Sequence, residues 1–323
     1  MTVSGRACGK LILAGEHAVV YGVPAVALGI DRGALAHAKE LASGPCRLRV
    51  TTWSADVSER DGHELARAFH ALLGSVRTDG ALAPVEVEAT TELPAGGGLG
   101  CSAALGVAIA RAVAPDASDD DIREHAMAWE RIFHGNPSGV DAAVATLGGA
   151  VQFVRQDERS VIETIAPLGS LVFAIGHSGI ASSTRAMVES VARQRAERPA
   201  AVEATFDAVR AVVGGVRAAL EAGDRVALGQ LLDQNQAHLG TLALSTPSIE
   251  LMCESAREAG ALGAKLTGAG GGGCVVALAD GRASAERILS AWKARSFEGF
   301  VAEIHTRGRA HAHDHAGSEL AAT

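Results

Sequence analysis

A cluster of glycines followed by small residues is the stretch whose residue types point most directly to chemistry. Four of the five residues from 96 to 100 are glycine, and Cys101, Ser102 and an alanine-rich run at helical spacing follow. Glycine lets the backbone adopt positive φ and approach a ligand without interference from Cβ. The first turn of a helix leaves backbone N–H groups unpaired and carries the positive end of the helix dipole, so it binds anions. The stretch therefore predicts a phosphate-binding loop.

Two familiar phosphate-binding loops differ from this stretch. A Walker loop requires a Lys-Ser or Lys-Thr pair after its last glycine, whereas Cys101 and Ser102 stand here. A Rossmann loop matches the letters Gly98-x-Gly100-x-x-Ala103, but it requires a following strand that ends in an acidic residue. The expected helix runs instead into a turn at 115–121, which disfavours a nicotinamide dinucleotide. A structural glycine loop without a ligand stays open as an alternative.

Charged side chains elsewhere are further candidates for a site. Lys10, Glu16 and His17 lie among apolar residues, where a charge is costly unless a ligand or a buried network partners it. Asp141 follows the turn 134–139, in which Gly, Asn, Pro and Ser force a loop. The local sequence alone favours a surface pair for Lys10 and Glu16 and an ordinary helix N-cap for Asp141.

The hydrophobic pattern places the glycine cluster between a strand and a helix. Residues 6–30 have the pattern of strand, turn and strand, and 85–91 alternate with period two and lead directly into Pro94. Residues 268–273 form a second glycine-rich loop that leads into a strand, so we expect it to pack against the first loop. Other strands are expected at 34–39, 46–53, 150–156, 161–168, 171–176, 274–279 and 299–306, and other helices at 64–73, 119–133, 142–147, 182–199, 200–221, 224–242 and 286–297.

Composition narrows the class of protein. The 323 residues are 48% hydrophobic and carry a formal net charge of −8, which argues against a nucleic-acid partner. Neither an apolar run of about 18 residues nor a secretory signal is present, so we expect a cytoplasmic protein that does not contact membranes. Five scattered cysteines indicate reduced thiols. The length suits two domains, 1–166 and 167–323, and the tail 308–323 is expected to be frayed.

Three motifs in this order resemble those of the GHMP small-molecule kinases, which include galactokinase, homoserine kinase and the kinases of mevalonate and phosphomevalonate. The motifs are 9–17 (GKLILAGEH), 94–104 (PAGGGLGCSAA) and 265–274 (KLTGAGGGGC). Residues 134–141 (HGNPSGVD), together with 15–25 and 182–185, resemble the mevalonate kinases within that family. The resemblance spans nearly the whole chain.

The resemblance implies an α+β fold of two domains. The ATP-binding domain, 1–166, would be similar to ribosomal protein S5 domain 2, and 167–323 would be a ferredoxin-like α+β sandwich. ATP and substrate would bind in the cleft between them. The family also suggests a homodimer.

The resemblance implies roles for individual residues as well. Asp141 matches the acid that faces the substrate hydroxyl, and Lys10 matches the lysine beside it. Ser102 and Glu130 match the family's Mg²⁺ ligands, and hydroxyl and carboxylate oxygens suit that cation. The ATP-binding residues implied are Gly96, Gly97, Gly98, Gly100, Cys101, Ser102 and Ala103. The substrate-binding residues implied are Glu16, His17, Gly139, Asp141 and Thr184.

The chain departs from the family pattern at Cys101, where the family usually has serine. The backbone N–H of Cys101 can still bind phosphate. A thiol beside the phosphates is expected to make the enzyme sensitive to alkylation.

The reaction that the resemblance implies is ATP-dependent phosphorylation of the 5-hydroxyl of (R)-mevalonate, a step of isoprenoid biosynthesis. Two alternatives stay open: another GHMP kinase, for phosphomevalonate, a sugar or homoserine, and a non-catalytic nucleotide-binding regulator on the same scaffold. A substrate that carries its own phosphate would need further basic residues, and the motif regions offer only Arg185 beyond Lys10. A regulator would be expected to lose Asp141, Lys10 or Glu130, and all three are present.

Overall fold

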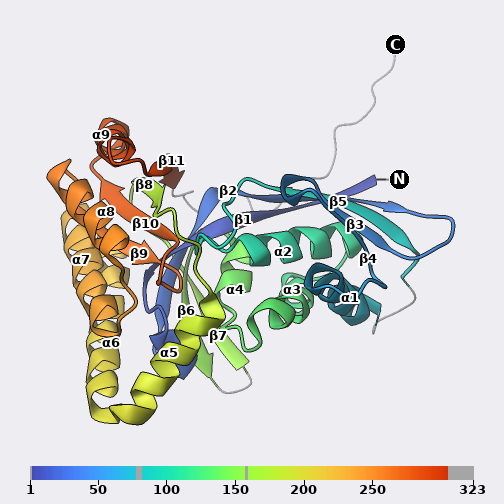
Figure 1. Ribbon diagram of the computed structural model, residues 1–323, viewed down its shortest axis with the longest axis horizontal. Helices are drawn as coiled ribbons and strands as arrows, with labels where there is room; N and C mark the ends of the chain where they lie inside the picture. Colours follow the sequence, from blue (N-terminus) through green and yellow to red (C-terminus); the bar gives the residue numbers. More distant parts are fainter. Residues whose placement is uncertain (1, 78–81, 157–158, 305–323) are drawn as a thin grey trace.

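The fold combines two β-sheets with helices packed against them (Figure 1). The computed structural model describes residues 2–77, 82–156 and 159–304, and the tail expected to be frayed lies outside these ranges. The first sheet ends at Ile165 and the second begins at Leu171. The expected α+β class is confirmed. The predicted domain boundary after residue 166 falls between the two sheets and stays a prediction.

The first sheet is mainly antiparallel and buries one of its faces. Its strands are β1 (Thr2–Ala14), β2 (Ala25–Glu40), β3 (Arg47–Val50), β4 (Ala55–Ser58), β5 (Val85–Thr91), β6 (Ala150–Gln156) and β7 (Arg159–Ile165). Their order is β4-β3-β5-β2-β6-β7, with β1 paired to β2, and only β3 and β5 run parallel. In β5, Val85 and Val87 are buried whereas Glu86 and Glu88 are exposed, as in a sheet with one face in solvent.

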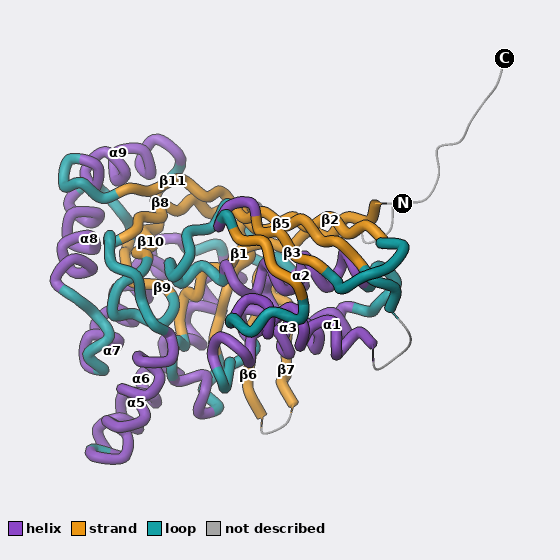
Figure 2. Tube along the Cα trace, turned by 45° about the vertical axis from the view of Figure 1, so that its right-hand side comes forward, coloured by secondary structure: helices purple, strands orange, loops and turns teal. Residues whose placement is uncertain are grey.

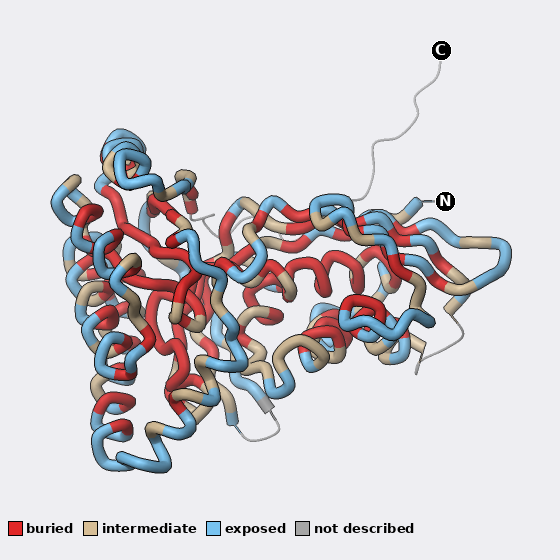
Figure 3. Tube along the Cα trace, viewed as in Figure 1, coloured by how far each residue is buried: buried red, intermediate tan, exposed pale blue. Residues whose placement is uncertain are grey.

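Helices α1 (Glu64–Arg77), α2 (Cys101–Val113), α3 (Asp119–His134) and α4 (Val140–Leu147) lie beside the buried face of this sheet (Figures 1 and 3). In α2 every residue except Ser102 and Arg111 is buried. Small side chains make this burial possible, since a Cβ on Gly106 would lie 2.9 Å from Cδ1 of Trp129. The core therefore holds α2 firmly, and its first turn has a fixed position.

The second sheet is antiparallel, with the order β11-β8-β10-β9. Its strands are β8 (Leu171–His177), β9 (Gly263–Thr267), β10 (Cys274–Ala279) and β11 (Glu298–Ile304). Its helices are α5 (Thr184–Glu197), α6 (Pro199–Ala222), α7 (Arg225–Thr241), α8 (Pro247–Glu258) and α9 (Arg282–Lys293). Helices join β8 to β9 and β10 to β11. If the four strands are numbered 1 to 4 along the chain, their order in the sheet is 4-1-3-2, which is ferredoxin-like. The expected ferredoxin-like fold of this part is confirmed.

The two parts meet where the end of β1 lies against β9. The backbone N–H of Ile12 donates to Oγ1 of Thr267 at 3.1 Å. A short 3₁₀ helix, η1 (Ala18–Tyr21), follows β1, and a second, η2 (Thr51–Trp53), replaces the end of the strand expected at 46–53. Figure 2 shows β1, β2, β3 and β5 of the first sheet side by side, with the helices of the second part grouped at the other end of the molecule. Among the described helices, none has the length and apolar character needed to cross a bilayer.

Candidate active site

The glycine cluster forms a turn at the N-terminus of α2. Gly96, Gly98 and Gly100 have φ of 68°, 74° and 73°, a region that residues with a Cβ rarely adopt. Hydrogen bonding within α2 begins with the N–H of Ala104, which donates to Gly100 O at 2.9 Å. The N–H groups of the first turn, beginning at Cys101, precede this bond, and the N-cap Gly100 has no side chain to cap them. The turn therefore has the form of an anion site.

The second glycine loop packs directly on the first, as expected. Cys274 N donates to Gly97 O at 3.0 Å. A Cβ on Gly98 would lie 2.4 Å from Thr267 O, and one on Gly268 would lie 2.7 Å from Gly98 Cα. Only glycine fits this close approach of two backbones.

Lys10 and Asp141 meet beside the glycine turn. Lys10 comes from β1, where its N–H donates to Leu99 O at 2.9 Å, and Asp141 lies in the first turn of α4. Lys10 Nζ is 3.1 Å from Asp141 Oδ1. A Cβ on Gly100 would lie 2.9 Å from Lys10 Cγ and 3.8 Å from Asp141 Oδ2. The start of α2, a lysine and an aspartate thus share one small volume.

Ser102 and Glu130 form a second polar pair at the same end of α2. Ser102 Oγ donates to Glu130 Oε1 at 2.5 Å, and Trp129 Nε1 donates to Ser102 Oγ at 3.2 Å. Burial, with a smaller contribution from nearby Asp141, raises the pKa of Glu130 to about 8. A carboxylate shut away from water in this way is ionised at neutral pH only if a cation joins it.

The pair fits a magnesium ion. Hydroxyl and carboxylate oxygens are ligands that Mg²⁺ accepts while it keeps several waters. Within the described ranges no three His, Cys, Asp or Glu residues gather in a way that could hold a metal. A cation here would therefore take few protein oxygens and complete its shell with water and phosphate.

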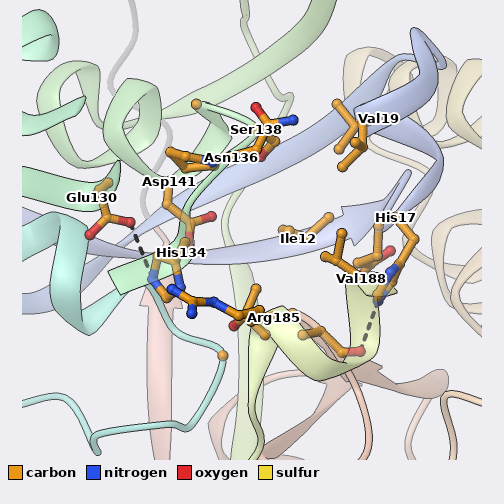
Figure 4. A pocket seen from close by; sticks show the side chains of 18 of the residues that line it. Ile12, His17, Val19, Glu130, His134, Asn136, Ser138, Asp141, Arg185 and Val188 are labelled. Atoms are coloured by element: carbon orange, nitrogen blue, oxygen red, sulfur yellow. Dashed lines mark hydrogen bonds and ion pairs between the residues drawn. The ribbon is translucent and has the colours of Figure 1, made fainter. Parts of the chain in front are cut away.

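A cavity of about 630 Å³ opens beside these groups. Its walls come from both parts of the chain and include the predicted Lys10, Glu16, His17, Glu130, Gly139, Asp141 and Thr184. In Figure 4, Glu130 and Asp141 lie on one side of the cavity, and His17 and Val188 lie on the other. Apolar walls come from Ile12, Val19, Val20, Met127 and Val188. Such a mixture of apolar walls and a few polar groups is typical of a small-molecule site.

Glu16 and His17, the two polar residues of the turn after β1, differ in whether their side chains are already paired with charged groups of the protein. A ring nitrogen of His17 is 2.8 Å from Ala269 O, and burial lowers the pKa of His17, so the ring is neutral at pH 7. The carboxylate of Glu16 forms an ion pair with Lys265 and accepts a hydrogen bond from Asn235 Nδ2 at 2.9 Å. Glu16 therefore lines the cavity with its carboxylate already engaged by protein groups.

Comparison with known proteins identifies the family. A family model described as the GHMP kinases N terminal domain matches residues 63–149, and one described as GHMP kinases C terminal matches residues 216–298. The mevalonate kinase of Pyrococcus abyssi is 32% identical to this chain over 304 residues, which cover 87% of this chain and 89% of that protein. This chain belongs to the GHMP kinase family.

Other relatives of this GHMP kinase cover it as completely. The mevalonate kinase of Methanothermobacter thermautotrophicus is 31% identical over 312 residues, covering 95% of this chain and 99% of that protein. The structure of L. major mevalonate kinase in complex with R-mevalonate matches with a TM-score of 0.81 and 28% identity, over 94% of this chain and 96% of that chain. Streptococcus pneumoniae phosphomevalonate kinase, in complex with phosphomevalonate and AMPPNP, matches with a TM-score of 0.78 over 94% and 100% of the chains, but at 18% identity it shares only the fold.

The structure corrects one expectation for this GHMP kinase. The thiol of Cys101 points into the core, where Sγ lies 3.5 Å from Leu93 O and 3.7 Å from Thr91 Oγ1. Burial raises the pKa of Cys101. The expected position of the thiol beside the phosphates is therefore wrong. Because a reactive thiol must be accessible and ionised, we now expect Cys101 to resist alkylation.

Sequence reasoning assigned no role to several residues at the site. His134 lines the cavity, with Nε2 3.5 Å from Glu130 Oε2, and Arg185 lines it from α5. Lys265 and Asn235 contact Glu16 from outside the cavity. A lysine within the apolar strand GAKLT is a visible signal that a buried partner exists, but nothing in the sequence says which acid that partner is.

Proposed function

We propose that this GHMP kinase transfers the γ-phosphoryl group of ATP to the 5-hydroxyl of (R)-mevalonate, giving 5-phosphomevalonate and ADP. The observation that carries the proposal is the Lys10–Asp141 ion pair, placed between the cavity and the first turn of α2. The likeness to proteins named mevalonate kinase, one of them bound to R-mevalonate, supports the choice of substrate.

The glycine turn would hold the phosphates of ATP. Phosphoryl transfer depends mainly on positioning and on neutralising charge, because its transition state is loose. Backbone N–H groups of the turn and of the first residues of α2, at the positive end of that helix, are suited to that task, whereas the N–H of Gly97 already donates to Pro94 O at 3.3 Å. The buried Lys10 would stabilise charge that develops at the transferred group.

Asp141 would act on the substrate hydroxyl. In the proposed reaction the hydroxyl oxygen forms a bond to the γ-phosphorus, the bond from phosphorus to the bridging oxygen of ADP breaks, and Asp141 accepts the hydroxyl proton. The neutral His17, together with Thr184 and Gly139, would orient the rest of the substrate in the cavity. Ser102 and Glu130 would hold Mg²⁺, which supplies positive charge to the β- and γ-phosphate oxygens when bound.

The charge of the cavity disfavours a phosphorylated substrate. Among the described residues, Lys10 and Arg185 are the Lys and Arg side chains that line it, and Lys10 is paired with Asp141. A substrate with its own phosphate would need more basic groups than these. The presence of Lys10, Asp141 and Glu130 disfavours a non-catalytic regulator.

A substrate screen tests the proposal. ADP release, measured by a coupled assay with mevalonate, phosphomevalonate, galactose and homoserine, should be rapid with mevalonate alone, and ³¹P NMR should show a phosphomonoester on the primary alcohol. Turnover of another of these substrates in place of mevalonate would support a different GHMP kinase, and nucleotide binding without turnover would support a regulator. We also propose a cytoplasmic homodimer, whose mass light scattering would measure.

A further inference from the structure

The turn Gly15–His17 is tied to the second part of the chain by a buried polar network. The side chain of Glu16 is 1% exposed and that of Lys265, on β9, is 0% exposed. Lys265 Nζ pairs with Glu16 Oε1, and Asn235 on α7 donates Nδ2 to Glu16 Oε2 at 2.9 Å. Both carboxylate oxygens of Glu16 therefore have partners that come from the other half of the chain.

Lys265 also reaches the backbone next to the turn. Its Nζ donates to Ile12 O at 3.1 Å and to Leu266 O at 2.5 Å, so its three donors are all used. Burial lowers the pKa of Lys265, and the Glu16 carboxylate opposes that shift. Well-packed apolar residues are often as stabilising as a buried ion pair, so stability alone does not account for this network.

His17 has a backbone conformation that needs support. Its φ of 60° and ψ of −51° are rare for a residue with a side chain. Such a conformation persists only where the surrounding structure holds it. The supports for this turn are the Glu16 network on one side and the contact from the His17 ring to Ala269 O on the other.

We propose that Lys265 and Asn235 are positioning residues that hold Glu16, so that the turn presents His17 to the substrate cavity. Because both carboxylate oxygens of Glu16 are engaged by the network, Glu16 affects substrate binding by positioning the turn. Neither Lys265 nor Asn235 lines the cavity, so any effect of theirs on substrate binding must pass through the turn. The expected effect on mevalonate binding rests on the proposed function. The claim that Lys265 and Asn235 hold the turn in place does not.

Asn235→Leu is the test variant. Leucine has nearly the shape of asparagine and removes the donor to Glu16. It also removes Asn235 Oδ1, a buried oxygen with no hydrogen-bond partner among the described residues, so the variant should fold. We expect KM for mevalonate to rise about tenfold or more, while kcat and KM for ATP change by less than about threefold. The Lys10–Asp141 pair lies outside the network, which is why turnover should survive.

Gln236→Met is the matched control. Gln236 is the next residue of α7, is buried, and bonds to Leu266 N, Ser245 and Glu250, none of which belongs to the turn. The control should destabilise the protein at least as much as Asn235→Leu and leave KM for mevalonate within about twofold of the wild type. An equal rise of KM in both variants would overturn the proposal, because general loosening of α7 would then explain it.

Hydrogen exchange gives a readout that needs no substrate. The N–H groups of Ala18, Val19 and Val20 all donate to carbonyl oxygens of the turn Gly15–His17. Their exchange should become about tenfold faster in Asn235→Leu and stay unchanged in Gln236→Met. Unchanged exchange in Asn235→Leu, or faster exchange with an unchanged KM in an active enzyme, would overturn the proposal. If the wild type does not turn over mevalonate but the exchange result is as expected, the proposed function fails and the support of the turn stands.

Discussion

Lys10 Nζ lies 3.1 Å from Asp141 Oδ1, and the two side chains of this ion pair differ widely in exposure, 3% for Lys10 and 35% for Asp141. The lysine is enclosed by the protein, whereas the aspartate faces the cavity. Its second oxygen, Oδ2, lies toward Gly100 at the start of α2. The buried lysine therefore fixes where the aspartate stands relative to the glycine turn, and it leaves one side of the carboxylate open to a substrate hydroxyl.

Gly100→Ala should disrupt this arrangement. Gly100 has φ of 73°, and its new Cβ would lie 2.9 Å from Lys10 Cγ. The alanine would strain the turn and displace Lys10 from Asp141, so we expect kcat/KM for ATP to fall by about tenfold or more. Steady-state kinetics with varied ATP would measure the change.

Gly74→Ala is the matched control for that substitution. Gly74 is exposed on α1, and a Cβ there would meet no atom within 4 Å. Alanine should leave the kinetics unchanged and stabilise the protein by about 0.5–1 kcal/mol, because it suits a helix interior better than glycine. Wild-type kinetics in Gly100→Ala would contradict the placement of the phosphates at this turn.

Glu130 gives the metal-free protein a distinctive pH dependence. The pKa of Glu130 is raised by burial from 4.5 to about 8. Between these values the folded protein holds a proton that the unfolded chain has released, so the free energy of unfolding falls as pH rises. The glutamine in Glu130→Gln cannot ionise, so the variant loses this dependence of stability on pH. In EDTA, the melting temperature of the wild type should therefore fall relative to that of the variant as the pH rises from about 5 to about 8.

Two controls accompany the Glu130 measurement. Magnesium with ATP should stabilise the wild type at the upper end of this pH range and stabilise Glu130→Gln much less. Glu88→Gln, on the exposed face of β5, should leave the melting temperature nearly unchanged. A difference between Glu130→Gln and the wild type that does not vary with pH would show that Glu130 is not the buried, proton-binding group described above.

Cys101 should resist alkylation in the native protein. Its thiol is buried against Leu93 and Thr91, and burial raises its pKa. Iodoacetamide should leave Cys101 unmodified and the activity intact, whereas unfolded protein should be labelled at all five cysteines. Mass spectrometry of peptides would locate the label. Rapid modification of Cys101 with loss of activity would place the thiol at the phosphates after all.

Much of the fold follows from local pattern. The alternation of Val85 to Thr91 predicts β5 with its observed bounds, and the acidic start at Asp119 predicts α3. The strand β9 was missed because its five residues, GAKLT, show neither an alternating pattern nor a continuous apolar run like that of β10. Helix α8 was missed too, although Thr246 before Pro247 is an N-terminal signal that the structure uses, with Thr246 Oγ1 accepting from Ile249 N.

The sequence predicted which residues belong to the site better than it predicted the contacts that they make. Motif spacing and family resemblance brought Lys10, Ser102, Glu130 and Asp141 to attention, and the structure brings them together at the start of α2. The partners of Glu16 could not be predicted, because Lys265 and Asn235 lie far away along the chain and only the tertiary fold brings them near. The direction of the Cys101 side chain likewise depends on packing that local sequence does not specify.

Asp141→Asn tests most directly the claim that this aspartate acts on the substrate hydroxyl beside a phosphate-binding turn. Asparagine keeps the shape of the side chain but cannot take the proton, and general-base assistance typically contributes about 10²- to 10⁴-fold in rate. A thermal melt should first show that the variant is folded, because the buried Lys10 loses its partner. The measurement is kcat with saturating mevalonate and ATP, alongside KM for ATP. We predict that kcat falls by about 100-fold or more while KM for ATP changes little, and a folded variant that keeps most of its turnover would contradict the account.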